Sequence, residues 1–135
     1  MTTPLIACLG AFQLPTHAAL ALVREALARA PRCTVLLSGA FRPRSPRYPF
    51  TWEERAGLLR QALDLQDRAR IDFRPVREGW GDERLRSEMQ AAVPGEQVVL
   101  LQPANAEPPP VPAGWRMERF DMPETQDADE LIPRL

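Results

Sequence analysis

Short, continuous apolar runs alternate along this chain with stretches in which apolar residues recur every three or four positions. The continuous runs predict buried strands at residues 5–9, 33–37, 71–76 and 97–101, with a fifth candidate at 115–120. The three-to-four spacing predicts helices over residues 17–30, 51–63 and 82–92. Because strands and helices alternate, we expect an α/β fold with three layers, α/β/α, around a parallel sheet of about five strands.

The segments that follow the carboxyl ends of the predicted strands are the candidates for a ligand site, since ligands of parallel sheets bind beyond those ends. Three such segments follow the first, second and fourth strands, and they cover residues 10–17, 38–51 and 102 onward. The first leads into a helix, whose unpaired N–H groups attract anions. The second contains Arg42, Arg44 and Arg47 and is followed by Arg55. A phosphorylated small molecule is therefore the expected ligand.

Each of these candidates also has an interpretation without a ligand. The arginines at 42–47 can belong to an ordinary solvated loop. Thr51 and Glu54 match a capping box, in which each side chain bonds the backbone of the other, and this explains their presence without a ligand. His17 is equally consistent with a surface residue at a helix start, and Trp80 with an exposed or interface side chain instead of a stacking platform for a base.

Composition limits the classes of function. A chain of 135 residues suits one domain, and we expect a domain over residues 1–120 followed by an acidic tail at 121–135. The formal net charge of -1 argues against a general electrostatic grip on nucleic acid. No apolar run is long enough to span a membrane, and the first residues lack the pattern of a secretory signal, so we expect a cytoplasmic protein.

The basic and thiol residues restrict the chemistry further. All 17 basic residues are Arg, so a phosphate has to be bound by Arg, His, hydroxyl or backbone N–H groups. Cys8 and Cys33 fall in predicted buried strands, where we expect them to pack as small apolar residues. Two cysteines and one histidine cannot supply a tetrahedral zinc site alone, and no protein-bound metal is predicted.

Two segments carry a resemblance to a known family. Residues 9–20 read LGAFQLPTHAAL and resemble the first motif of nicotinamide-nucleotide adenylyltransferases, G-R-F-Q-P-F-H-x-G-H-L, in the type that is fused to a Nudix hydrolase. Residues 49–55, PFTWEER, are similar to that family's N-P-F-T-x-x-E-R. Residues 73–77 with Trp80 and Asp82 look like the exit of its third strand. Together the similarities cover about residues 5–101, and they imply a Rossmann-like nucleotidyltransferase fold.

The resemblance implies a reaction and a set of site residues. Members of the family join nicotinamide mononucleotide to ATP, which forms NAD and releases pyrophosphate, and Mg²⁺ accompanies the ATP. By this resemblance Thr16 stands at the first histidine position of the motif, and His17, in the variable slot beside it, is the second candidate catalytic residue. The positions that would bind the nucleotide are Gly10, Ala11, Phe12, Gln13, Ser38, Arg42, Arg47, Phe50, Thr51, Arg55 and Trp80.

The departures from the family pattern fall on the residues that contact phosphate. Ala11 replaces an arginine, Thr16 replaces the first histidine, and Ala19, which cannot donate a hydrogen bond, replaces the second. His17 stands two positions before Ala19, and two positions on a helix correspond to a rotation of about 200°. The imidazole of His17 should therefore not take the place of a histidine side chain at position 19. The family's final S-x-T-x-x-R has only the acidic segment 127–134 as a counterpart, and the Nudix module is absent. Each lost donor typically costs about 3–4 kcal/mol of transition-state stabilisation.

Three functions are therefore weighed for this chain. We favour a catalytically degenerate relative of the adenylyltransferases that binds a nucleotide or another phosphorylated small molecule. The first alternative is an active enzyme that transfers AMP from ATP to nicotinamide mononucleotide. The second is an interaction protein without a small-molecule site, which would form homo-oligomers through the proline-rich segment after residue 102 and the tail.

Overall fold

The sheet and its helices follow the order that the sequence predicts. The computed structural model describes residues 5–10, 17–38, 50–77, 81–95 and 97–121. Its strands are β1 (Leu5–Gly10), β2 (Cys33–Leu37), β3 (Ile71–Pro75), β4 (Val98–Pro103) and β5 (Arg116–Phe120). Its helices are α1 (His17–Arg29), α2 (Trp52–Gln61), α3 (Leu65–Arg68) and α4 (Asp82–Ala92).

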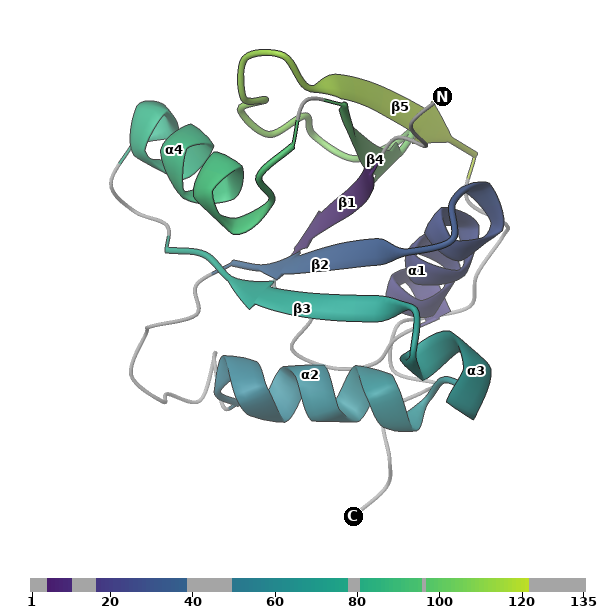
Figure 1. Ribbon diagram of the computed structural model, residues 1–135. Coiled ribbons are helices and arrows are strands. Elements are labelled where there is room, and N and C mark those ends of the chain that lie inside the picture. The colour runs from purple at the N-terminus through teal and green to yellow at the C-terminus, as the bar shows by residue number, and fades with distance from the viewer. Residues whose placement is uncertain (1–4, 11–16, 39–49, 78–80, 96, 122–135) are drawn as a thin grey trace.

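All five strands are parallel, in the order β3-β2-β1-β4-β5 (Figure 1). The chain first moves outward from β1 through β2 to β3, then crosses back to the other side of β1 to form β4 and β5. The direction of winding therefore reverses between β1 and β4. In open sheets of this kind such a reversal marks the crevice where ligands bind.

Helices cover both faces of the sheet, which confirms the three-layer arrangement (Figure 1). On one face, α1 and α2 pack their apolar sides on alternate strand residues, and Val23, Leu59 and Leu101 are fully enclosed there. On the other face, α4 contributes Met89 against Leu36 and Leu100. Successive strand residues point to opposite faces, so each buried strand supplies both apolar clusters.

The start of α2 is fixed by the capping box predicted for it. The Thr51 hydroxyl accepts a hydrogen bond from the backbone N–H of Glu54 at 3.2 Å, and the Glu54 carboxylate accepts one from the N–H of Thr51 at 2.9 Å. Two N–H groups that a helix start leaves unpaired are satisfied in this way. The box therefore fixes the first turn of α2, the helix that follows β2 in the chain.

Two features differ from the sequence-based expectation, and a third, the proline-rich segment, agrees with it. Strand β4 continues two residues past Leu101, through Gln102 and Pro103. The four-residue helix α3, begun by an Asp64 side chain that accepts from the N–H of Asp67 at 2.9 Å, is too short to show periodicity. The proline-rich crossover at 104–115 forms no helix but still covers the α4 face, where Val111 and Trp115 pack on the apolar cluster and Pro112 is fully enclosed.

None of the helices in the described part of the chain is long and apolar enough to cross a membrane. The boundary between the expected domain and its acidic tail falls at residue 121, and residues 122–135 lie outside the described residues. The expected division of the chain there stays a prediction.

The two cysteines are buried in the core, as predicted. Cys8 on β1 and Cys33 on β2 are free thiols whose sulfur atoms lie 3.8 Å apart. The strand register sets Cys8 beside Val35 and Cys33 beside Ile6, so the two cysteines are diagonal neighbours. A hydrogen bond with Cys33, together with burial and the proximity of that second thiol, raises the pKa of Cys8 well above its ordinary value.

We expect both thiols to resist N-ethylmaleimide in the folded protein at pH 8 and to react fully in denaturant, as counted by mass spectrometry.

Above the ordinary thiol pKa of about 8.5, the unfolded chain loses a proton that folded Cys8 retains. The stabilisation from this thiol is therefore complete at lower pH and is lost as the pH rises. A Cys8→Ala variant should show a flatter fall in unfolding free energy between pH 8 and pH 10, and an identical fall in both proteins would contradict the assignment.

Candidate functional site

The carboxyl ends of β1 and β2 meet at one edge of the sheet. Gly10 lies beside Leu37 in the parallel register, and the N–H of Ser38 donates to the carbonyl of Gly10 at 3.0 Å. The segments that leave these two strands therefore start next to each other. This confirms that the first two predicted ligand-site segments begin at the same edge.

Arg55 bridges the two ends of the segment that follows β2. Its Nη1 donates to the carbonyl of Ser38 at 2.9 Å, and its Nε donates to the carbonyl of Thr51 at 3.4 Å. The side chain is 1% exposed although it carries a permanent charge. A buried charge is tolerated only where hydrogen bonds replace its hydration, and the two carbonyls supply part of that replacement. Arg55 therefore places a positive charge just below the edge of the sheet.

The helix that follows β1 begins at the same edge. His17 is the first residue of α1 and is half-buried. Ala19, which stands where the family motif has its second histidine, is 5% exposed and packs in the apolar cluster together with Leu20. The side chain at position 19 therefore faces the core and has no group to donate.

The pairing of β1 with β4 stops short of this edge. Their parallel register begins at Leu5 and Val98 and ends at Ala7 and Leu100. Beyond that point β1 continues to Gly10 in register with β2, while β4 continues to Pro103 in register with β5. The paired register of these two central strands thus ends three residues before the end of each strand, at the point where the winding direction reverses.

Only two polar side chains are classed as buried in the described part of the chain, and both lie at this edge. One is Arg55, beside the end of β2, and the other is Gln102, which is 5% exposed near the end of β4. They stand on either side of the end of β1. Sequence reasoning missed Gln102 as a site residue because the fourth apolar run was taken to end at Leu101. The signal was a lone amide directly after four buried apolar residues.

The structure describes about half of the predicted site residues. Gly10, His17, Ser38, Phe50, Thr51 and Arg55 are described, and the last three stand at or within the start of α2. The others lie outside the described residues, namely Ala11, Phe12, Gln13, Thr16, Arg42, Arg47 and Trp80. No group of three or more His, Cys, Asp or Glu residues among those described could hold a metal ion.

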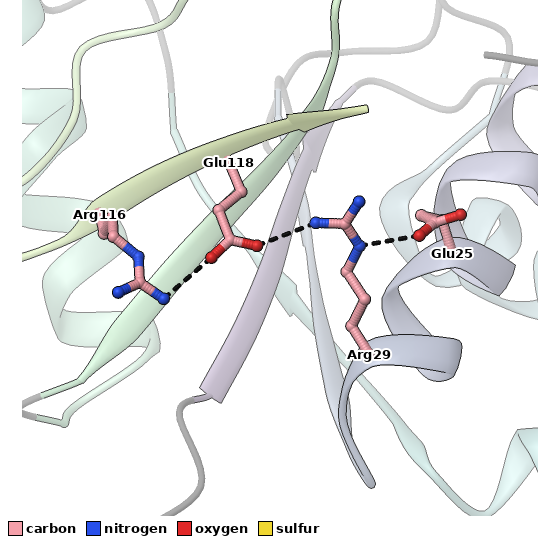
Figure 2. A network of polar contacts seen from close by, with 4 residues as sticks. All are labelled: Glu25, Arg29, Arg116 and Glu118. Carbon is pink, nitrogen blue, oxygen red and sulfur yellow. Dashed lines mark hydrogen bonds and ion pairs between the residues drawn. The ribbon is translucent and has the colours of Figure 1, made fainter. Parts of the chain in front are cut away.

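A second polar cluster lies at the opposite, amino-terminal edge. Glu25 and Arg29 at the end of α1 join Glu118 and Arg116 of β5 through contacts of 2.8, 2.9 and 2.9 Å (Figure 2). Hydrogen bonding to Glu25 is the main cause that raises the pKa of Arg29. Both oxygens of Glu118 are occupied by arginines, and the four formal charges cancel.

A hollow of about 350 Å³ adjoins this cluster, over Ile6 and Val99. The arginines and glutamates beside it already satisfy one another, so we interpret the cluster as a link between α1 and the edge strand. Exposed pairs of this type contribute about 0.2–1 kcal/mol each.

Comparison with known proteins supports the fold. No family model matches the chain, and no curated protein matches it in sequence. A crystal structure of a bifunctional NMN adenylyltransferase/ADP ribose pyrophosphatase from Francisella tularensis matches with a TM-score of 0.70 and 14% identity over 96% of this chain. A second crystal structure of such a protein from that organism, complexed with AMP and a manganese ion, matches with a TM-score of 0.65 and 15% identity over 96% of the chain.

The chain spans 41% and 40% of the length of those two proteins. At such low identity the likeness establishes the fold alone. The chain has a Rossmann-like α/β fold with a five-stranded parallel sheet in the order 3-2-1-4-5, and this fold matches that of the two structures.

Proposed function

We propose that this protein binds an adenine nucleotide, or a closely related phosphorylated small molecule, at the carboxyl edge of its sheet. The observation that carries the proposal is the pair of buried polar side chains, Arg55 and Gln102, on either side of the end of β1. A buried cation supports phosphate binding, and a buried amide supports contact with a base.

We further propose that the chain is a degenerate relative of the NMN adenylyltransferases. Transfer of AMP to nicotinamide mononucleotide needs donors that stabilise charge on the phosphate in flight. At the motif position of the second histidine the chain carries Ala19, which packs in the core. Ala11 and Thr16, the other departures in this motif, lie outside the described residues. Where ATP is the ligand, Mg²⁺ would accompany its phosphates.

Thermal unfolding in the presence of ATP, AMP, NAD and nicotinamide mononucleotide tests the binding proposal. A ligand at 100 times its dissociation constant should stabilise the protein by about 2.7 kcal/mol. Inorganic phosphate at the same concentration is the control, because it separates nucleotide recognition from general anion binding. If none of the four nucleotides raises the unfolding temperature, the interaction-protein alternative is favoured and the proposal fails.

Release of pyrophosphate from ATP, nicotinamide mononucleotide and Mg²⁺ tests the loss of catalysis. We expect no turnover above a protein-free control. Turnover that Thr16→Ala abolishes would instead support the active adenylyltransferase. A cytoplasmic location and the absence of nucleic-acid partners remain predictions from the sequence.

A further inference from the structure

Gln102 carries a buried amide for which the described residues provide no hydrogen-bond partner. Its side chain takes part in no hydrogen bond in the part of the chain that the structure describes. In that same part, no fully enclosed side-chain nitrogen or oxygen lacks a partner. The small exposed fraction of Gln102 therefore includes the amide, while the aliphatic stem is covered.

Gln102 lies near the point where the pairing of β1 with β4 ends. Gln102 is the next-to-last residue of β4, two residues beyond the point where the register with β1 ends. Strand alternation sets it on the α4 face with Val98 and Leu100, which belong to the apolar cluster there. Leu9 of β1, partly buried, packs against the same cluster. Gln102 thus lies next to the apolar cluster of the α4 face, beside the end of β1.

An amide in such surroundings is suited to a neutral, planar, polar group. A carboxamide presents one acceptor and one donor side by side, and this pair matches the N6 amino group and N7 of adenine. Phosphate is better served on the β2 side of Gly10, where Arg55 and the start of α1 lie. Arg55 belongs to α2 on one face of the sheet and Gln102 stands on the α4 face, so a nucleotide that contacts both has to lie across the carboxyl edge, over the end of β1.

We propose that Gln102 is a specificity-determining residue that hydrogen-bonds the adenine base of the bound nucleotide. The inference rests on the proposed function and adds that the base lies on the β4 side of β1. It also predicts which purines are accepted. A ring that carries an oxygen at position 6, as in inosine, cannot donate to the amide oxygen and should bind more weakly.

Calorimetric titration of ATP and of inosine triphosphate into the wild-type protein and Gln102→Met tests this inference. The wild type should prefer ATP by about 5- to 100-fold, the range for one bidentate amide contact to adenine. Gln102→Met should lose most of that preference, chiefly through weaker ATP binding. Gln97→Met, which changes an exposed glutamine just before the opposite end of the same strand, should retain it.

Thermal unfolding without ligand provides an independent readout. Because the amide has no partner to lose, Gln102→Met should unfold at the wild-type temperature or above it. A clear fall would show that the amide is satisfied inside the fold and would overturn the inference. Equal preference for ATP in wild type and Gln102→Met would overturn it while leaving the proposed function intact. Absence of any nucleotide binding by the wild type would overturn both.

Discussion

Arg55→Met should lower the free energy of unfolding by about 2–4 kcal/mol, as measured by urea denaturation followed by tryptophan fluorescence. The methionine fills a similar volume, but the carbonyls of Ser38 and Thr51 lose the donors that they now have at 2.9 and 3.4 Å. An acceptor left buried without a donor costs more than the original bond contributed. The unfolding free energy of Arg55→Lys should lie between those of the wild type and Arg55→Met, because one ammonium group cannot donate to both carbonyls equally well.

The matched control for this prediction is Arg24→Met on α1. Arg24 is exposed and makes no hydrogen bond or ion pair with the described part of the chain. Its loss should change stability by less than about 0.5 kcal/mol. If Arg55→Met behaves like this control, the contacts of Arg55 do not support the edge of the sheet. Arg55→Met also bears on ligand binding, since Arg55 holds a positive charge beside the end of β2.

Arg70→Met should cost about 2 kcal/mol by the same measurement. Arg70 stands just before β3 and donates to three backbone carbonyls at the end of α1, those of Leu27, Ala30 and Pro31. The last carbonyls of a helix have no partner within the helix, and a cation there also complements the helix dipole. The expected loss stays moderate because the side chain is 37% exposed and water can reach the freed carbonyls.

Arg74→Met is the control for this second prediction. Arg74 lies on β3, four residues after Arg70. Its side chain is 55% exposed and forms an ion pair with Asp72. A surface pair of this type contributes about 0.2–1 kcal/mol, so the two variants should differ clearly. Equal losses in Arg70→Met and Arg74→Met would show that the carbonyl contacts add nothing beyond an ordinary surface charge.

Helix faces and starts could be predicted because their signals are local. Apolar spacing in α1 identified Leu20, Val23 and Leu27, all of which are buried. The Thr51 and Glu54 pair identified the start of α2, since a capping box needs only residues three apart. Helix α3 was missed because four residues show no period, and its first residue, Leu65, is 77% exposed.

The candidate site was predictable as a location but not as a set of contacts. The rule that ligands bind beyond the carboxyl ends pointed to Gly10 and Ser38, which do lie side by side. It could not reveal that Arg55 bonds two backbone carbonyls, because those bonds depend on how α2 packs under β2. Gln102 was missed as a site residue since its burial depends on the neighbouring strands and on α4.

The order of strands and helices, the apolar faces of those elements and the parallel character of the sheet follow from the sequence alone, because hydrophobic periodicity is written in neighbouring residues. Packing decided where the pairing of β1 with β4 ends, which polar groups are enclosed at the carboxyl edge, and how Arg29 reaches Glu118 across 89 positions of chain. Such relations join residues that are remote in sequence, and they exist only once the apolar faces have been buried against each other.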